Sequence, residues 1–345
     1  MCGIAGWQLA PGSRRDVADI AAMARAIAHR GPDDQGTYAD DSAGLALAHR
    51  RLSIIDLTTG GHQPMIAEDN SVVLVFNGEL YNYLALKQEL EALGRRFRSR
   101  SDTEVALNAL AQWGPAALER FDGMFALAAW YAADRRLLLA RDPLGMKPLY
   151  YTTRGMGGGI AFASEIKSFL QLRGFLPEVN RRSLRQYLEF GYAFDEQDTS
   201  LAGVSKLQPG HAMEIVAGRA GQPYAYFSVP ESRKRDEVPF EQMVDELHAT
   251  LSEVVRQHLV ADVPVGLLLS GGLDSSIIAA LAARDTRVAT ISMGFAESAI
   301  DERSFARTVA GHIGSDHHEV LIHHREMAED LAEVVWYFDD LFADW

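Results

Sequence analysis

A change in the rhythm of apolar residues near residue 239 constrains the fold more than any other feature of this 345-residue chain. Beyond that point, strand-like and helix-like runs alternate strictly. The strand-like runs lie at 263–269, 288–293 and 319–322, and the helix-like runs lie at 240–254, 277–283, 304–313 and 325–337. This alternation predicts an α/β domain with a parallel, Rossmann-like sheet and helices on its faces.

The first part of the chain, up to about residue 170, follows a different pattern, in which strands outnumber helices. A loop is expected after the turn-rich run 29–34. Strands are expected at 3–9, 45–49, 72–76, 124–131, 137–141, 149–152 and 160–163, and helices at 17–27, 83–93 and 106–113. Many strands without a repeated strand–helix–strand unit predict a layered α+β domain.

The stretch from 171 to 238 is less regular, because prolines and glycines interrupt its short apolar pieces. We expect it to be a connecting segment between two domains, 2–170 and 239–345. The chain length of 345 residues fits this division, since a domain has roughly 150 residues.

Composition excludes several classes of protein. The formal net charge of −14 argues against a nucleic-acid partner, because such binding relies on Lys and Arg to neutralise phosphates. No run reaches the roughly 18 apolar residues that span a bilayer, and no basic and apolar leader opens the chain. The single cysteine leaves no intramolecular disulfide. We therefore expect a cytoplasmic protein without a membrane partner.

That single cysteine is residue 2. If Met1 is removed, Cys2 carries both a nucleophilic thiol and a free α-amine that can accept the thiol proton near neutral pH. A small second residue favours this removal. The alternative is a structural role, in which Cys2 is a small buried residue that opens a strand.

Runs elsewhere in the first domain favour the catalytic interpretation. They are Met1-Cys2-Gly3-Ile4, His29-Arg30-Gly31-Pro32-Asp33, Arg51-Leu52-Ser53-Ile54-Ile55-Asp56, Asn77-Gly78-Glu79-Leu80-Tyr81-Asn82, Ser101-Asp102-Thr103-Glu104 and Arg141-Asp142-Pro143-Leu144-Gly145. In this order they closely resemble the class II glutamine amidotransferases. The resemblance covers residues 1 to about 170 and implies an N-terminal-nucleophile αββα sandwich.

Amide hydrolysis passes through a tetrahedral oxyanion that needs preorganised hydrogen-bond donors. Asn77 offers a side-chain amide and Gly78 an unobstructed backbone N–H just past the strand expected at 72–76. The alternative interpretation of Asn-Gly is a hairpin turn with no catalytic part.

The family resemblance also implies how free glutamine would be held. Arg51 would clamp its α-carboxylate, and Asp102 and Glu79 would receive its ammonium group. Backbone contacts would come from Leu52, Ser53, Ile54 and Ile55. The alternatives are a surface arginine and a helix-capping box formed by Ser101 and Glu104, which is compatible with a binding role of Asp102.

A second motif lies in the C-terminal domain, between an apolar strand and an apolar helix. Glycines in the run Ser270-Gly271-Gly272-Leu273-Asp274-Ser275-Ser276 let backbone N–H groups converge on an anion, and the serines add hydroxyl donors. No Gly-Lys-Ser/Thr follows, so it is not a Walker A loop. The alternative is a serine–glycine turn without a ligand.

This run resembles the pyrophosphate loop of the ATP pyrophosphatases, the adenylating fold of asparagine synthases. The resemblance implies that ATP is a co-substrate and that Asp274 helps hold Mg²⁺. The residues it assigns to ATP are Leu269, Ser270, Gly271, Gly272, Asp274, Ser275 and Met293.

Together the two resemblances indicate a glutamine-dependent asparagine synthase, in which ammonia released at Cys2 amidates ATP-activated aspartate. We expect the synthetase domain to be incomplete, because a second Ser-Gly-Glu-Gly-type loop is missing, although the run 338–344 resembles the approach to the aspartate pocket. A homodimer is what the family suggests. The alternatives are amidation of another carboxylate, a chain with glutaminase activity alone, and an inactive interaction module.

Overall fold

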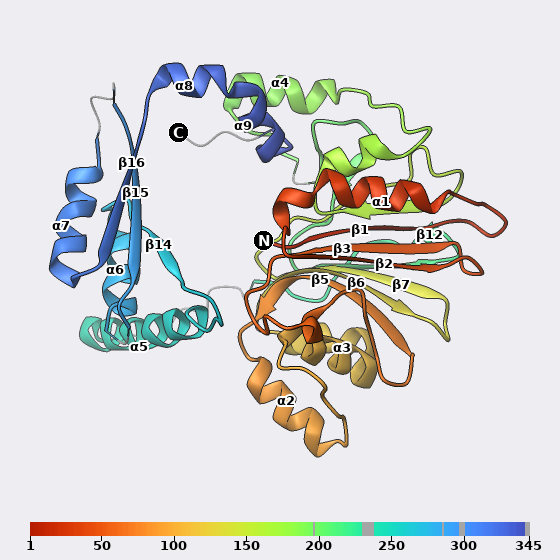
Figure 1. The fold of residues 1–345 in the computed structure, drawn as a ribbon, viewed down its shortest axis with the longest axis horizontal. Helices are drawn as coiled ribbons and strands as arrows, with labels where there is room; N and C mark the ends of the chain where they lie inside the picture. Colours follow the sequence, from red (N-terminus) through yellow and green to blue (C-terminus); the bar gives the residue numbers. More distant parts are fainter. Residues whose placement is uncertain (196, 230–237, 285, 297–300, 342–345) are drawn as a thin grey trace. The chain divides into compact units, whose positions relative to one another are not determined.

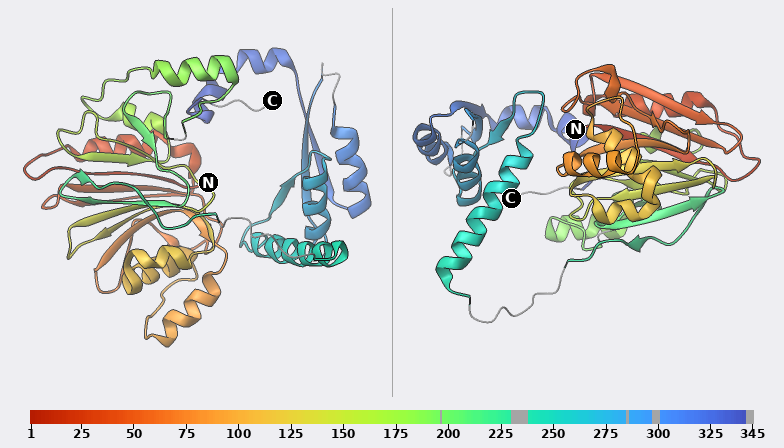
Figure 2. Two further views of the ribbon diagram at one scale, coloured as in Figure 1. Left: turned by 180° about the vertical axis from the view of Figure 1, so that it is seen from behind. Right: turned by 90° about the horizontal axis from the view of Figure 1, so that it is seen from below.

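The computed structural model describes residues 1–195, 197–229, 238–284, 286–296 and 301–341. The chain divides into two units. Unit 1 comprises Met1–Val229 together with Phe338–Trp345, and unit 2 comprises Pro230–Tyr337. Figures 1 and 2 show both units in ribbon form from three sides.

The first sheet of unit 1 is antiparallel, with the strand order β10-β8-β9-β1-β3-β2. Its strand β1 lies between β3 and β9, so that Gly3 pairs with Arg50 and Ala5 pairs with Ala163. Cys2 therefore sits directly before a central strand. The strands are β1 (Gly3–Gln8), β2 (Asp34–Asp40), β3 (Leu45–Arg51), β8 (Tyr150–Thr152), β9 (Ile160–Ala163) and β10 (Val204–Lys206).

The second sheet of unit 1 has the order β12-β11-β7-β6-β5-β4, and β13 also pairs with β11. Strand β5, next to the edge strand β4, pairs with β6 so that Asn77 lies opposite Ala126 and Gly78 opposite Phe125. The strands are β4 (Met65–Ile66), β5 (Val72–Leu80), β6 (Gly123–Tyr131), β7 (Arg136–Arg141), β11 (His211–Val216), β12 (Arg219–Ala220) and β13 (Tyr224–Ala225).

The two sheets pack face to face, and helices cover their outer faces (Figure 1). Strand β5 shows how the sequence specifies this. Val73 and Val75 face the core between the sheets, whereas Leu74 and Phe76 face the core under the helices, as alternation along a strand requires. α1 (Val17–Ala26) covers the first sheet, and α2 (Tyr83–Ala92) and α3 (Asp102–Trp113) cover the second. The predicted αββα sandwich is confirmed.

Shorter elements complete unit 1. They are η1 (Ala28–Arg30), η2 (Thr59–Gly61), η3 (Gly114–Arg120), η4 (Ile166–Gln171) and α4 (Arg181–Phe190). Of these, η4 packs with α1 over the first sheet.

Two stretches of unit 1 differ from the sequence-based expectation. Residues 34–40, expected in a loop, form the edge strand β2, whose polar residues alternate between partial burial and exposure. The expected connecting segment 171–238 includes β10, which pairs with β8, and β11, which pairs with β7. Its residues up to Val229 belong to unit 1. The strands after residue 171 were not recognised because prolines and glycines interrupt the short apolar pieces of that stretch.

Unit 2 contains a parallel sheet of order β14-β15-β16, which confirms the predicted parallel arrangement. The expected helix over 325–337 is instead two helices, because the chain breaks at Asp330, whose carbonyl accepts from the N–H groups of Glu333 and Val334. The elements are α5 (Phe240–His258), β14 (Gly266–Leu268), α6 (Leu273–Ala282), β15 (Ala289–Phe295), α7 (Arg303–Ile313), β16 (Asp316–Ile322), α8 (His324–Glu329) and α9 (Leu331–Phe338).

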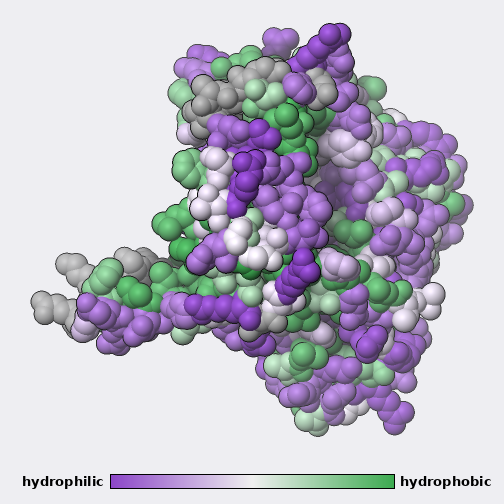
Figure 3. Space-filling model, turned by 60° about the vertical axis from the view of Figure 1, so that its left-hand side comes forward, coloured by the Kyte–Doolittle hydropathy of each residue, from purple (hydrophilic) through white to green (hydrophobic). Residues whose placement is uncertain are grey.

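Apolar residues are less completely buried in unit 2 than in unit 1. Leu268 and Leu273 are 81% and 77% exposed. Within the described residues of unit 2, the core consists of two small apolar clusters, one around Val255 and Val288 and one around Leu269 and Ala306. Figure 3 shows apolar side chains, in green, at the molecular surface among polar ones. Within the residues that the structure describes, no helix is long and apolar enough to cross a bilayer.

Candidate active site

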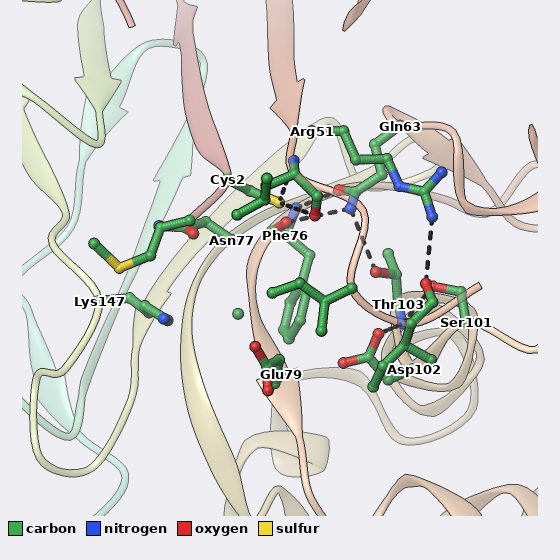
Figure 4. A pocket seen from close by; sticks show the side chains of 15 residues that line it. Cys2, Arg51, Gln63, Phe76, Asn77, Glu79, Ser101, Asp102, Thr103 and Lys147 are labelled. Atoms are coloured by element: carbon green, nitrogen blue, oxygen red, sulfur yellow. Dashed lines mark hydrogen bonds between the residues drawn. The ribbon is translucent and has the colours of Figure 1, made fainter. Parts of the chain in front are cut away.

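A pocket in unit 1 gathers most of the predicted glutaminase residues (Figure 4). It lies where the start of β1, the end of β3, the C-terminal part of β5 and the start of α3 meet. Ser53 is the one predicted glutamine-binding residue outside the lining. The lining residues are Met1, Cys2, Arg51, Leu52, Ile54, Ile55, Gln63, Phe76, Asn77, Gly78, Glu79, Ser101, Asp102, Thr103 and Lys147.

The thiol of Cys2 exchanges two hydrogen bonds with one backbone residue. Cys2 Sγ donates to the carbonyl of Leu52 at 3.6 Å, and the N–H of Leu52 donates to Sγ at 3.4 Å. The carbonyl of Cys2 accepts from Arg30 Nε at 2.9 Å. Burial raises the pKa of the thiol. This raised pKa favours the protonated thiol, so a base would have to remove its proton before the sulfur could act as a nucleophile.

Asn77 and Gly78 lie inside β5, not in a turn, so the hairpin alternative is wrong for these residues. The Asn77 side chain is fully buried, and among the described residues neither its Nδ2 nor its Oδ1 has a hydrogen-bond partner. A buried amide without partners costs roughly 1–3 kcal/mol. At Gly78 a Cβ would lie 2.2 Å from the carbonyl oxygen of Met124, so only glycine fits against β6.

Arg51 is buried, which excludes the surface-arginine alternative. Its guanidinium donates to the carbonyls of Thr58 at 2.9 Å, Ile55 at 3.3 Å and Asp56. These bonds fold the loop after β3 around the guanidinium and hold the backbone of residues 52–55 at the pocket wall. Close packing completes the arrangement, since a Cβ on Gly61 would lie 1.8 Å from Arg51 Nη2.

Asp102 is buried in the first turn of α3, and its carboxylate accepts from the N–H of Leu80 at 3.0 Å and of Thr103 at 2.8 Å. Burial raises the pKa of Asp102 to about 6; the N–H group of Leu80 opposes this shift, and the carboxylate of Glu79 adds to it. A cationic group placed against Asp102 and Glu79 would relieve this repulsion.

The helix cap next to Asp102 differs from the predicted capping box. The Ser101 hydroxyl accepts from the N–H of Thr103 at 3.2 Å and caps α3. Glu104 bonds instead to the N–H groups of Arg98 and Ser99, at 2.9 and 2.7 Å. Its carboxylate therefore stabilises the loop that precedes the cap.

The lining residues that were not predicted as site residues are Met1, Gln63, Phe76, Ser101, Thr103 and Lys147. The side-chain oxygen of Gln63 accepts from the N–H of Phe76 at 2.7 Å, and its amide donates to the Phe76 carbonyl at 3.2 Å, which fixes β5 just before Asn77. Lys147 is 6% exposed, and its amine is directed into the pocket (Figure 4). Burial lowers the pKa of Lys147, whereas the nearby carboxylate of Glu79 opposes this.

The Arg141-Asp142-Pro143-Leu144-Gly145 run explains why Lys147 faces the pocket. The buried Asp142 carboxylate accepts from the N–H groups of Leu144, Met146 and Lys147 at 3.1, 2.9 and 2.9 Å. Arg141 donates to the carbonyl of Lys147 at 2.8 Å. These hydrogen bonds show that the run 141–145 folds one loop. Lys147 lies just after this run, so the run is the sequence feature from which Lys147 could have been predicted as a pocket residue.

In unit 2, the predicted nucleotide loop joins β14 to α6. Gly271 has φ +85°, and a Cβ there would lie 2.5 Å from the backbone nitrogen of Ala306, so the loop requires glycine. The hydroxyls of Ser270 and Ser275 lie 3.0 Å apart. The Ser276 hydroxyl is buried and lacks a partner among the described residues. These polar groups at a helix N-terminus fit a phosphate ligand.

The remaining residues assigned to ATP differ in exposure. The side chain of Leu269 is buried with Ala306 and Ala310, so its backbone alone can border a ligand. Met293 on β15 is 60% exposed, and Asp274 is exposed in the first turn of α6.

The comparisons with known proteins agree with both halves of the chain. Residues 1–227 match the family model of the glutamine amidotransferase domain, and residues 246–345 match that of asparagine synthase. Glutamine-hydrolyzing asparagine synthetase 1 of Bacillus subtilis (strain 168) is 37% identical over 94% of this chain and 50% of its own length. The chain belongs to the glutamine-hydrolysing asparagine synthetase family.

Other relatives of this asparagine synthetase family member differ in name and in length. A protein of Methanocaldococcus jannaschii, also named as a glutamine-hydrolyzing asparagine synthetase, is 30% identical over 100% of this chain and 69% of its own. Amidase chry2 of Gibberella zeae is 33% identical over 98% of this chain and 53% of its own. This chain thus spans about half the length of the B. subtilis and G. zeae relatives.

Among solved structures, the glutamine phosphoribosylpyrophosphate amidotransferase of B. subtilis matches with a TM-score of 0.48 and 18% identity. The match covers 92% of this chain and 65% of that one.

The raised pKa of Asp102 predicts a pH-dependent stability in this family member. The folded protein binds the Asp102 proton more tightly than the unfolded chain, whose carboxyl titrates near 3.8. Relative to Asp102→Asn, the wild type should therefore lose unfolding free energy as the pH rises from about 4 to 7. The loss should reach about 3 kcal/mol, since one pKa unit corresponds to about 1.4 kcal/mol. Urea unfolding of both proteins across this pH range measures it, and a difference that does not change with pH would contradict the burial argument.

Proposed function

We propose that this chain hydrolyses glutamine at Cys2 and supplies the ammonia to an ATP-dependent amidation. The observation that carries the proposal is the Asn77 side chain, which is buried without a partner in the same pocket as Cys2. An amide that is left unpaired at a structural cost is suited to bind an oxygen atom that becomes negatively charged only during a reaction.

The first chemical step is attack by the Cys2 sulfur on the side-chain carbonyl carbon of glutamine. With Met1 removed, the α-amine of Cys2 accepts the thiol proton. The amine must be neutral to do so, and nearby positive charges disfavour its protonated form. Arg30 reaches the Cys2 carbonyl, and the amine of Lys147 lines the same pocket, so both provide such charge.

Collapse of the tetrahedral intermediate forms a thioester on Cys2 and expels ammonia, which takes up the proton held by the amine. Water then cleaves the thioester and releases glutamate. Asn77 Nδ2 and the backbone N–H of Gly78 are proposed to stabilise the oxyanion in both steps. The bulk of a side chain at residue 78 is excluded by β6, which keeps that backbone accessible.

Recognition of free glutamine is assigned to other residues of the same pocket. Asp102 and Glu79 present carboxylates that would bind the α-ammonium group. Burial is the main cause of the raised pKa of Asp102, and a bound ammonium group would relieve the smaller contribution that comes from repulsion by Glu79. Arg51 and the backbone of residues 52–55 would hold the α-carboxylate.

In unit 2, the loop Ser270–Ser276 is proposed to bind the pyrophosphate part of ATP, with Leu269 and Met293 bordering the nucleoside. Asp274 would help hold Mg²⁺, which neutralises phosphate charge when it is bound with the nucleotide. In the complete reaction, aspartate is adenylated, ammonia replaces AMP, and asparagine, AMP and pyrophosphate are released.

A second candidate is amidation of a carboxylate other than aspartate. It is favoured by the relative named Amidase chry2, whose match covers 98% of this chain. Product analysis with ATP, glutamine and either aspartate or a panel of other carboxylic acids separates the two candidates. Asparagine as the amide product supports the first, and an amide of another acid supports the second.

Replacing the nucleophile or the oxyanion donor should abolish or greatly reduce glutamine hydrolysis. Cys2→Ala should release no ammonia above background. Asn77→Ala should lower kcat by about 10²–10³-fold with little change in KM, because the donor acts mainly in the transition state. Ammonia release from glutamine measures both, with mass spectrometry establishing that Met1 is gone.

Asn108→Ala is a matched control, because this buried asparagine on α3 donates to the carbonyl of Glu104 and lies outside the pocket lining. It should keep kcat within about twofold, since it touches no group of the proposed mechanism. Equal losses in Asn77→Ala and Asn108→Ala would refute the oxyanion assignment. A processed wild type without glutamine turnover would favour the inactive interaction module.

The unpaired Ser276 hydroxyl gives a test of the nucleotide loop. Without nucleotide, Ser276→Ala should leave the unfolding free energy within about 1 kcal/mol, because the hydroxyl has no partner to lose. Affinity for ATP with Mg²⁺ should fall about tenfold or more, as expected for a lost hydrogen bond to a charged group. Titration calorimetry measures the affinity, with Ser252→Ala on α5 as the control. An unchanged affinity would remove Ser276 from the site.

A further inference from the structure

Four charged side chains are buried together next to Cys2, and of these the proposed hydrolytic mechanism uses only Arg30. Glu165 and Lys167 follow β9 at the start of η4, and Arg30 ends η1. Their side chains are 5%, 4% and 9% exposed. The fourth member, Asp339, is 5% exposed and comes from the segment that returns to unit 1 after α9.

These side chains form a continuous series of contacts that ends at the nucleophile. Asp339 Oδ1 lies 3.2 Å from Lys167 Nζ, and Lys167 Nζ donates to Glu165 Oε2. Arg30 Nη1 donates to Glu165 Oε1 at 2.9 Å. Arg30 Nε in turn donates to the carbonyl oxygen of Cys2 at 2.9 Å. One arginine thus connects the ion-pair cluster to the residue that carries both the nucleophile and its proposed base.

Asp339 contributes one of the two negative charges of this cluster. The carboxylates of Asp339 and Glu165 face the cations Lys167 and Arg30, and the His29 ring also contacts Glu165 Oε1 at 3.0 Å. Removing one partner of a buried pair leaves the others without compensation, and they rearrange or admit water. Burial raises the pKa of Glu165, but hydrogen bonds from Lys167 and Arg30 outweigh this and lower it, which agrees with a carboxylate that stays ionised.

Asp339 also fixes the backbone on which this cluster is built. Its carboxylate accepts from the N–H of Lys167 at 3.0 Å and from the N–H of Ile166. These are N–H groups at the start of η4 that lack an intrahelical partner, so Asp339 caps η4 from a position 172 residues away in the sequence. The position of Lys167 therefore depends on Asp339 twice, through its side chain and through its backbone.

We propose that Asp339 is a positioning residue for Cys2, acting through Lys167, Glu165 and Arg30 to hold the Cys2 carbonyl and thereby orient its thiol and α-amine. The inference deepens the proposed function and rests on Cys2 being the glutaminase nucleophile. Under this proposal the segment 338–341 takes part in glutamine hydrolysis. The same segment belongs to the run 338–344, which resembles the approach to an aspartate pocket. Residues 342–344 of that resemblance lie outside the described residues.

The neighbouring residue supplies a matched control. Asp340 lies on the same segment and is also anchored to unit 1, where it accepts from the N–H of Ser200 at 2.8 Å and pairs with Lys206 at 2.9 Å. None of the contacts described for Asp340 leads to Arg30 or Cys2. Loss of anchoring alone should therefore affect Asp339→Asn and Asp340→Asn alike, whereas positioning of Cys2 should distinguish them.

The test is steady-state ammonia release from glutamine by the full chain with Met1 removed. Asp339→Asn should lower kcat about tenfold while KM stays within twofold, because none of the four residues of the cluster lines the pocket. Asp340→Asn should keep both parameters within twofold. If the wild type is active and the two variants do not differ, the inference fails while the proposed function stands. If the wild type itself releases no ammonia, the proposed function fails first.

A double-mutant cycle tests the route of action. In an Arg30→Met background, Asp339→Asn should have almost no further effect on kcat, because the connection to Cys2 is already cut. If the kcat losses of the two single variants instead multiply in the double variant, Asp339 acts by another route and the proposal is overturned. Should Asp339→Asn not fold, Lys167→Met probes the same connection, with the same loss of kcat at constant KM expected and an unchanged kcat counting against the proposal.

Discussion

The packing of two antiparallel sheets against each other determines the position of every group in the candidate active site. Cys2 belongs to one sheet, as the residue before β1, and Asn77 belongs to the other, as a residue of β5. Neither sheet alone brings them together. The core between the sheets, which includes the fully buried Trp130, Leu47 and Val75, sets their separation. Interiors of this kind are close-packed and resist small shifts, so the core holds Cys2 and Asn77 at a fixed separation.

The candidate site combines polar side chains that have hydrogen-bond partners with an amide, that of Asn77, that has none among the described residues. The guanidinium of Arg51 and the carboxylates of Asp142 and Asp102 all have hydrogen-bond partners that hold loops or strand ends in place. The Asn77 amide has none among the described residues. Local rules of folding are often broken where a protein works, because a group that must bind a transient charge cannot already be paired. Asn77 thus differs from Arg51 and Asp102, which are held in place by hydrogen bonds and also face the pocket.

Much of the fold and of the site was predictable from the sequence, and the failures have physical causes. Cys2 was singled out by its thiol and its position, Arg51 and Asp102 were singled out by runs that resemble the class II glutamine amidotransferases, and long strands such as β6 were found through their apolar runs. The strand β2 was missed because both of its faces are partly exposed, so its side chains do not alternate in hydropathy. The pocket residue Gln63 was missed because its partner Phe76 lies 13 residues away, and pairing across space leaves no local pattern.

The capping of η4 by Asp339 has a consequence for how the protein is made. A ribosome synthesises Lys167 long before Asp339, since 172 residues separate them. Domains generally begin to fold while synthesis continues. Until Asp339 leaves the ribosome, Lys167 and Glu165 lack one of their countercharges and η4 lacks its cap. Under the proposal above, the Cys2 thiol would be less well positioned throughout elongation, so unfinished polypeptides would hydrolyse glutamine more slowly than the finished chain.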